Sequence, residues 1–363
     1  MIILGSTGSI GTNALKIAKD NDIEIEMLVA GSNVELLNKQ IKQFNPRIIA
    51  LKDSTNKDRL DANKNQKVYF GEDGILQGLN EAKSHIAINA IVGFSGLKPS
   101  LEIIKLGKIL ALANKESLVV GGEFIDTANI IPLDSEHFAL QELIRGKTNI
   151  KKMIITASGG ALRDVDINTI STQTPQSALE HPNWNMEKKI TLDSATMVNK
   201  LYEILEAKYL FQTNNIDALI ERNSIIHALI QTNDNAIFAH LGYNDMKLPI
   251  SYAMLGKRAK NIESIKDIDL CNLTFNLSKI DTNRYPLWNL KDNLLDNPKL
   301  GIILNAANEI LVYKFLANKI KFGDISTNIY KAIYRFESQI KYVKSIEDVF
   351  YLNKEVVEFY SFN

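Results

Sequence analysis

The sequence predicts an α/β protein that begins with a Rossmann-like, doubly wound domain. Residues 1–4 form a short apolar stretch typical of a strand, followed directly by a glycine-rich turn at 5–11 and an amphipathic helix at 12–19. This order brings backbone N–H groups to a phosphate at the helix N-terminus. Strand-like and helix-like stretches then alternate as far as residues 109–113. Such alternation indicates a parallel sheet with helices on both faces.

The ligand of this domain is predicted from its glycines and from the end of the second strand, residues 24–30. The turn has the spacing GxxGxxG, and the second strand ends in Gly31, Ser32 and Asn33. An NAD-binding protein carries an acidic residue here for the ribose 2′-hydroxyl, so its absence favours NADP. A doubly wound domain that binds another phosphate ligand remains the alternative.

Length and composition limit the class of protein. A chain of 363 residues is long enough for two or three domains. Its 42 basic and 42 acidic residues balance, which gives no support to a nucleic acid or an anionic membrane as partner. The single cysteine, Cys271, excludes an internal disulfide and argues against a cysteine-based zinc site. With no signal peptide visible and no apolar run long enough for a bilayer, we expect a cytoplasmic protein.

Two acidic residues stand one residue apart in the sequence PLDSEH, residues 132–137. On an extended segment Asp134 and Glu136 would point to the same side and could share a hard divalent cation. The ordinary alternative is a helix start, with Asp134 as its cap and Glu136 in the first turn. Lys115, in the sequence NKES, follows a predicted strand at the edge where such sheets bind ligands, although a surface lysine is the common case.

Further candidates lie between residues 153 and 211, which we assign to an α+β domain. Ser158, followed by two glycines, could present a hydroxyl and amides to an anion. A loop with His181 and Trp184 reads either as a lid or as a tryptophan folded onto the core. Asp193 or Ser194 is expected to cap the helix that follows.

On that helix, Asn199 and Lys200 lie four and three residues before Glu203, so the three side chains should be close. A solvated ion pair is the alternative. Glu206 is a second candidate carboxylate, and spacing alone does not choose between it and Glu203. Three helical patterns after residue 304 predict a small all-helical C-terminal domain.

Taken together, these motifs resemble one enzyme family. The set GSTGSIG, ANKES, PLDSEH, SGG, HPNW, DSATMVNK with Glu203, and LNAANE at 304–309 is similar to that of the 1-deoxy-D-xylulose 5-phosphate reductoisomerases. These are NADP-dependent enzymes of the non-mevalonate isoprenoid pathway. The resemblance implies rearrangement of 1-deoxy-D-xylulose 5-phosphate and its reduction by NADPH to 2-C-methyl-D-erythritol 4-phosphate. It also implies a homodimer.

The resemblance further implies roles for individual residues. The metal ion, Mg²⁺ or Mn²⁺, would be held by Asp134, Glu136 and Glu203, the last chosen because the family's ligand lies three residues after the lysine of the NK pair. The catalytic residues implied are Lys115, Asp134, Glu136 and Glu203. Substrate binding is implied for Lys115, Ser135, Glu136, Ser158, His181, Trp184, Ser194, Asn199, Lys200 and Glu203. NADPH binding is implied for Thr7, Gly8, Ser9, Ile10, Gly31, Asn33, Asn114 and Glu116.

The sequence departs from the family's pattern at two positions. Ser32 stands where a basic residue often faces the cofactor's 2′-phosphate, and Glu187 stands where a glycine is common. We still expect a strong preference for NADPH over NADH.

Four segments are expected: an NADPH-binding domain at 1–131, a catalytic domain with a lid loop at 132–262, a linker at 263–295 and a helical domain at 296–363. Two other functions remain as alternatives. One is a different two-domain NADP-dependent oxidoreductase, which would not need three carboxylates, and the other is a nucleotide sensor without activity.

Overall fold

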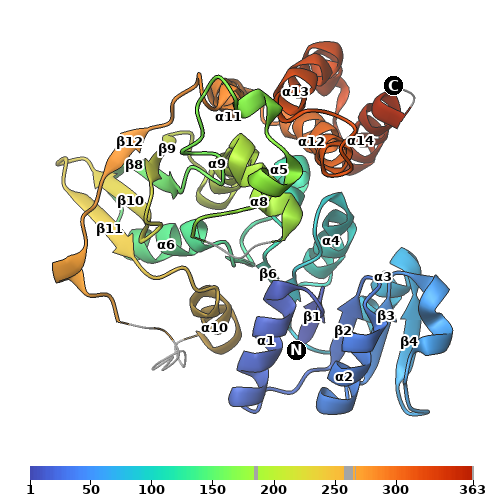
Figure 1. The fold of residues 1–363 in the computed structure, drawn as a ribbon. Helices are drawn as coiled ribbons and strands as arrows, with labels where there is room; N and C mark the ends of the chain where they lie inside the picture. The colour runs from blue at the N-terminus through green and yellow to red at the C-terminus, as the bar shows by residue number, and fades with distance from the viewer. Residues whose placement is uncertain (184–186, 257–264, 266, 362–363) are drawn as a thin grey trace. The chain divides into compact units, whose positions relative to one another are not determined.

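The computed structural model describes residues 1–183, 187–256, 265 and 267–361 (Figure 1). The chain divides into two compact units. The first comprises Met1–Ser117, Ile125–Phe138 and Asp245–Lys266, and the second comprises Leu118–Phe124, Ala139–Asn244 and Asp267–Asn363.

The first unit is built on a parallel sheet of seven strands. The strands are β1 (Ile2–Leu4), β2 (Met27–Ala30), β3 (Ile48–Leu51), β4 (Lys67–Phe70), β5 (Ile86–Asn89), β6 (Ile109–Leu112) and β7 (Ile130–Pro132). Their order across the sheet is β4-β3-β2-β1-β5-β6-β7, so the chain reverses its direction of travel between β1 and β5. This order confirms the doubly wound prediction, and a ligand of such a sheet binds at the carboxyl ends of the strands beside that reversal.

Helices cover both faces of this sheet because its strands are apolar on both sides. Helices α1 (Ser9–Asp20), α2 (Val34–Phe44) and α10 (Lys247–Leu255) pack with Ile3, Leu28 and Ile49 in one buried cluster. The neighbouring residues Met27 and Ile48 point to the opposite face, where they touch Gly78. Gly78 belongs to α3 (Gly71–Glu81), and α4 (Leu97–Lys105) packs beside α3.

The second unit holds a mixed sheet of five strands, in the order β11-β10-β8-β9-β12. The strands are β8 (Ile150–Ala157), β9 (Ile216–Glu221), β10 (Ile226–Thr232), β11 (Ile237–Leu241) and β12 (Leu277–Lys279). Strands β8 and β9 are parallel and the other pairs are antiparallel, which is the α+β arrangement expected. The helices between β8 and β9 are α7 (Pro175–Ala178), α8 (Lys188–Thr196) and α9 (Val198–Phe211).

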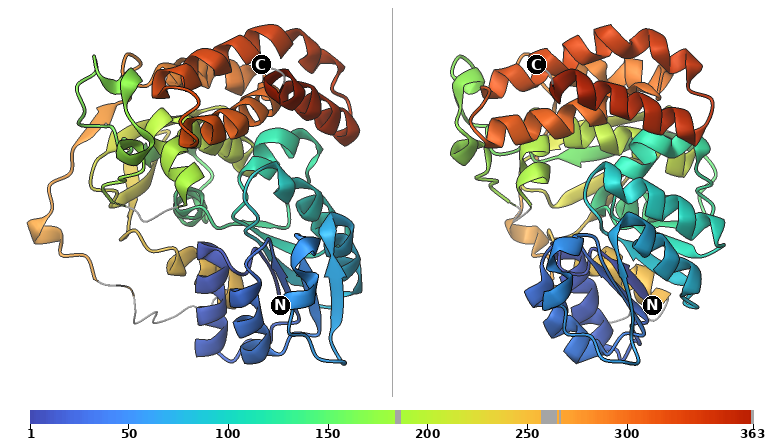
Figure 2. Two further views of the ribbon diagram at one scale, coloured as in Figure 1. Left: turned by 45° about the vertical axis from the view of Figure 1, so that its right-hand side comes forward. Right: turned by 90° about the vertical axis from the view of Figure 1, so that its right-hand side faces the viewer.

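Three long helices end the chain, as the sequence predicts. They are α12 (Leu300–Leu316), α13 (Phe322–Phe336) and α14 (Ile346–Ser361). Figure 2 shows them side by side, with α13 and α14 each packed against α12. Helix α12 begins before the LNAANE motif and buries most of it. Across the described part of the chain, each helix is too short or too polar to cross a lipid bilayer.

Candidate active site

The glycine-rich turn is held tightly at the carboxyl ends of β1, β2 and β5. The amides of Gly5 and Ser6 donate to the carbonyl of Val29 at 2.9 and 2.8 Å. Gly5 has φ +79°, and a Cβ there would lie 2.5 Å from the carbonyl oxygen of Ala90. A Cβ on Gly11 would overlap the backbone of Gly5 and Ser6. Only glycine fits these two positions, so the turn brings its backbone to the edge of the sheet.

The first six residues predicted to bind cofactor lie along this edge. Thr7, Gly8, Ser9 and Ile10 form the turn and the start of α1, whose N-cap, Gly8, has no side chain with which to cap the helix. The edge continues at Gly31, where an added Cβ would meet nothing within 4 Å, and at Asn33, which caps α2 by accepting from the amide of Leu36 at 3.1 Å. A helix N-terminus of this kind suits the phosphates of a dinucleotide, and with no acidic residue at 31–33 a 2′-phosphate would meet no repulsion there.

The other two predicted cofactor residues, Asn114 and Glu116, follow β6. The side-chain amide of Asn114 donates to the carbonyls of Ile91 and Gly93 at 2.6 and 2.8 Å and to the Glu116 carboxylate at 3.2 Å. Asn114 thereby fixes the loop after β5 at the same edge of the sheet.

Lys115 and Asp134 form an ion pair in the first unit. The Nζ of Lys115 lies 2.8 Å from Oδ2 of Asp134, and the two side chains are each 12% exposed. The other oxygen, Oδ1, accepts from the amide of Glu136 at 3.1 Å and lies 3.0 Å from Nδ1 of His137. The Asp134 carboxylate is therefore fixed on both oxygens.

The extended geometry predicted for Asp134 and Glu136 is wrong. Strand β7 ends at Pro132 and helix α6 (Ser135–Ile144) begins one residue after Asp134. Asp134 sits at the helix start and Glu136 in the first turn, as in the alternative interpretation, because an acidic residue there satisfies amides of the turn. Ser135 donates from its Oγ to the Glu136 carboxylate at 2.5 Å.

His137 is a neighbour of Asp134 that the sequence interpretation did not single out. Its side chain is fully buried, and its ring contacts the Asp134 carboxylate. The signal was its spacing, since a residue three positions after a helix cap lies on the same face as the cap.

In the second unit, the structure places Ser158 and His181 side by side. The amide of Gly160 donates to the Ser158 Oγ at 3.1 Å, and His181 Nε2 lies 2.9 Å from the same oxygen. Burial, and then the positive charge of Arg163, lower the pKa of His181 to about 4. The ring is therefore neutral at pH 7.

The hydrogen-bond pattern assigns the tautomer of this histidine. The amide of Asn183 donates to Nδ1 of His181 at 3.1 Å, so the hydrogen of the neutral ring is on Nε2 and is donated to Ser158. The Ser158 oxygen accepts from both neighbours. Its own hydrogen is then directed to an acceptor, for which a phosphate oxygen is suited.

The predicted cap at Asp193 or Ser194 is wrong. Both residues lie inside α8, and the helix break comes at Met197, which has φ +68° between α8 and α9. The turn at Gly160 packs directly against α8, because a Cβ on Gly160 would lie 2.7 Å from the Ala195 backbone. Ser194 is thereby held next to the turn that carries Ser158.

On α9 the predicted proximity of Asn199, Lys200 and Glu203 is confirmed. Asn199 Nδ2 donates to Glu203 Oε1 at 2.5 Å, and Lys200 Nζ forms an ion pair with Oε2. The side chains of Lys200 and Glu203 are 3% and 2% exposed, so the alternative of a solvated ion pair is wrong. Glu206, one turn further on, is also buried.

A buried polar network behind α8 and α9 was also missed. Asp193 accepts from Lys189 Nζ at 2.7 Å and from Asn308 Nδ2 at 2.8 Å. Tyr202 donates from its hydroxyl to Oδ1 of Asn305 at 3.1 Å. The two asparagines belong to the LNAANE motif, which therefore anchors both helices.

Trp184, which the sequence assigns either to a lid or to the core, lies outside the described residues.

Comparison with known proteins identifies the family. Residues 1–122 match the family model described as 1-deoxy-D-xylulose 5-phosphate reductoisomerase, residues 130–211 match its C-terminal domain, and residues 241–359 match a DXP reductoisomerase C-terminal domain. Curated relatives extend the match to almost the whole chain. The 1-deoxy-D-xylulose 5-phosphate reductoisomerase of Wolinella succinogenes is 53% identical over 99% of both chains. That of Helicobacter pylori strain HPAG1 is 49% identical over 99% of this chain and 98% of its own.

Solved structures agree in fold. A DOX-P reductoisomerase in complex with NADPH, fosmidomycin and magnesium is 30% identical, with a TM-score of 0.88 over 99% of this chain and 96% of its own. The Zymomonas mobilis enzyme in complex with NADPH is 31% identical, with a TM-score of 0.84 over 98% and 96%. The chain therefore belongs to the 1-deoxy-D-xylulose 5-phosphate reductoisomerase family.

Proposed function

We propose that this protein rearranges 1-deoxy-D-xylulose 5-phosphate and reduces the product with NADPH to 2-C-methyl-D-erythritol 4-phosphate, a step of non-mevalonate isoprenoid precursor biosynthesis. The proposal rests on the sequence identity between this chain and known reductoisomerases, which is about one half over nearly the full length and reaches 53% with the Wolinella succinogenes relative. Structures with similar folds hold NADPH and magnesium.

The proposed metal ligands are Asp134, Glu136 and Glu203, which offer only carboxylate oxygens and so suit Mg²⁺ or Mn²⁺. The first two belong to the first unit and Glu203 to the second. Asp134 and Glu203 each pair with a lysine ammonium, so both carboxylates are placed where positive charge stabilises them. When bound, the ion supplies Lewis acidity that polarises the substrate carbonyl.

The side chains of the second unit bind the phosphate of the substrate. Ser158, Ser194 and Asn199 offer neutral donors, and Lys200 adds one positive charge. His181 orients the Ser158 hydroxyl through Nε2, and because its ring is neutral at pH 7 it adds no charge of its own.

In the first unit, Lys115 and Ser135 contact the carbonyl and hydroxyl oxygens of the substrate. The Lys115 ammonium donates a hydrogen bond to an oxygen that gains negative charge during the rearrangement, which lowers the energy of that charge. The glycine turn and Asn114 position the dinucleotide, and NADPH then transfers hydride to the aldehyde product of the rearrangement.

Three further assignments belong to the proposal. The functional segments we propose are those expected from the sequence: 1–131 for NADPH, 132–262 for catalysis, 263–295 as linker and 296–363 as helical domain. Their bounds differ from those of the two compact units, since Ile125–Phe138 and Asp245–Lys266 belong to the first unit. The enzyme is placed in the cytoplasm by the sequence expectation alone. A homodimer is supported by the family resemblance and by the edge strand β11, where Ile237 and Phe238 are 61% and 42% exposed. Light scattering should give twice the chain mass of 40.7 kDa.

The test is to mix the purified protein with 1-deoxy-D-xylulose 5-phosphate, NADPH and Mg²⁺ and to follow the nicotinamide absorbance. Wild type should consume NADPH, chelation should stop the reaction, and added Mg²⁺ or Mn²⁺ should restore it. The Asp134→Asn variant should be nearly inactive. Turnover that survives chelation would favour a metal-independent oxidoreductase, and NADPH binding without turnover would favour a nucleotide sensor.

A further inference from the structure

The loop after β2 lacks the positive charge that a 2′-phosphate requires. Residues 31–33 are Gly31, Ser32 and Asn33, which are exposed and neutral. A phosphate monoester carries nearly two negative charges at pH 7, and a lysine or arginine usually pairs with it. If this chain prefers NADPH, a cation must come from another element at the same edge of the sheet.

Lys52 begins beside this loop. It is the first residue after β3, and its amide donates to the carbonyl of Ala30 at 3.0 Å. The next amide, that of Asp53, donates to the carbonyl of Gly31 at 3.0 Å. These two bonds continue the β2–β3 pairing past the strands and fix the Lys52 backbone next to Gly31.

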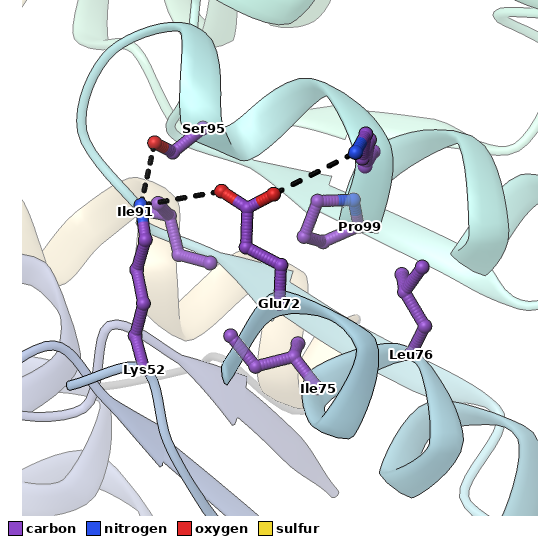
Figure 3. A pocket seen from close by; sticks show the side chains of 8 residues that line it. Lys52, Glu72, Ile75, Leu76, Ile91, Ser95 and Pro99 are labelled. Carbon is purple, nitrogen blue, oxygen red and sulfur yellow. Dashed lines mark hydrogen bonds and ion pairs between the residues drawn. The ribbon is translucent and has the colours of Figure 1, made fainter. Parts of the chain in front are cut away.

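The Lys52 side chain runs along the carboxyl edge of the sheet into a small pocket (Figure 3). Its Nζ donates to Ser95 Oγ at 2.7 Å and lies 3.5 Å from Oε1 of Glu72. Ser95 belongs to η2 (Phe94–Gly96), in the segment after β5. The ammonium is thus held at the edge that runs from the end of β3 to the segment after β5. That edge includes the reversal of strand order where a dinucleotide binds.

The other charged residues around the loop have partners of their own or start on another element. The Asp53 carboxylate accepts from the amide of Thr55 and from Asn56 Nδ2, both at 3.0 Å, and so caps η1 (Ser54–Arg59). Arg59 pairs with Glu35 at 3.0 Å. Lys98 makes a similar pair with Glu72, at 3.6 Å, but it starts on α4 on the other side of the pocket, whereas the Lys52 amide bonds to Ala30 at the end of β2.

We propose that Lys52 is the residue that selects NADPH over NADH, by pairing with the 2′-phosphate in place of the basic residue that Ser32 replaces. Glu72 and Ser95 hold the ammonium before the cofactor binds. The Lys52 side chain is 38% exposed and the Glu72 side chain 49%, so this pair is weak and can exchange for a phosphate. This inference rests on the proposed function, since it concerns the same cofactor.

Calorimetric titration with two mononucleotides tests this assignment without turnover. Adenosine 2′,5′-bisphosphate and adenosine 5′-monophosphate differ only by the 2′-phosphate. In Lys52→Met, affinity for the bisphosphate should fall roughly 10- to 100-fold, the range of a charged hydrogen bond, while affinity for the monophosphate should stay within about 2-fold. Lys52→Arg should retain the preference.

Two more variants separate this role from a structural one. Glu72→Gln removes the competing carboxylate and should tighten the bisphosphate by about 2- to 5-fold, the opposite direction to Lys52→Met. Lys98→Met is the matched control, which removes a lysine from the same pocket and should leave the ratio of the two affinities unchanged. Equal losses for both nucleotides in Lys52→Met, an unchanged ratio, or a loss of the preference in Lys98→Met would each overturn the assignment.

The turnover assay keeps the two proposals distinguishable. If wild type converts 1-deoxy-D-xylulose 5-phosphate with NADPH while Lys52→Met keeps its nucleotide preference, only the role of Lys52 is refuted. If wild type does not convert this substrate, the proposed function fails whatever the nucleotide affinities are.

Discussion

At the scale of single residues, two of the three proposed metal-binding carboxylates are paired with lysines. Lys115 pairs with Asp134, and Lys200 pairs with Glu203, with exposures of 12% or less. A buried carboxylate without a partner would be strongly destabilised, so these pairs explain how the acidic groups are kept in place. They also explain how two of the proposed metal ligands can be held in place without a cation.

The choice between Glu203 and Glu206 gives the first prediction. Glu203→Gln keeps the shape of a buried side chain but removes the charge, so kcat at saturating Mg²⁺ should fall by at least about 100-fold. Glu206→Gln is the matched control on the same helix and should keep its dependence on Mg²⁺. Steady-state kinetics over a series of Mg²⁺ concentrations measures both. A larger loss in Glu206→Gln would reassign the ligand.

The protonation state of His181 gives the second prediction. Its pKa of about 4 lies below the ordinary value of 6.5, so the unfolded chain binds this proton more readily between those values. The contribution of His181 to stability is therefore present above pH 6.5 and lost as the pH falls toward 4. An NMR titration should show a neutral ring at pH 5.5, with its resonance assigned by comparison with His181→Asn. A midpoint near 6.5 would contradict the burial of the ring and the effect of the Arg163 charge.

At the scale of elements, a glycine turn that packs against a helix sets the position of a site residue. Gly160, with φ +72°, lies against the backbone of Ala195 and so holds the Ser158 turn on α8. Gly146 has nearly the same φ, +73°, but an added Cβ there would meet nothing within 4 Å. Substituting alanine at each position therefore separates the free-energy cost of a left-handed backbone from the cost of a steric clash with α8.

These two glycines give the third prediction. Gly146→Ala should lower the free energy of unfolding by about 1–2 kcal/mol, the cost of a left-handed conformation for alanine. Gly160→Ala should lower it by about 1–3 kcal/mol more, because the helix backbone must move. Chemical denaturation measures both variants. Equal losses would show that α8 does not depend on this contact.

The elements of the first sheet could be predicted from local pattern. Residues 48–51 are apolar and bounded by polar residues, and β3 has these bounds. The sequence left the start of α6 as one of two alternatives, because Asp134 is compatible with either a strand end or a helix cap, and the amides of the following turn decide between them. The break at Met197 has no local signal, since methionine rarely adopts a positive φ and tertiary packing imposes it there.

Contacts between site residues could be predicted from the sequence only where the residues lie close together along the chain. Lys200 and Glu203 are three residues apart on a helix, which predicts their ion pair, but not that it is buried. The bonds from Asn308 to Asp193 and from Tyr202 to Asn305 join residues more than 100 positions apart. Spacing along the chain carries no information about such contacts.

At the scale of the whole molecule, the proposed chemistry divides between the two units. The first unit carries the dinucleotide edge, Lys115, Asp134 and Glu136, and the second carries the phosphate donors, Lys200 and Glu203. Neither unit holds the full set of proposed ligands. The proposal that Asp134, Glu136 and Glu203 bind one cation therefore draws on residues of both units.

Anomalous diffraction from crystals soaked in Mn²⁺ tests this claim most directly. We expect one manganese peak bonded to oxygens of Asp134, Glu136 and Glu203 at roughly 2.0–2.3 Å. A manganese ion bound by Asp134 and Glu136 while the carboxylate of Glu203 remains paired only with Lys200 would contradict it.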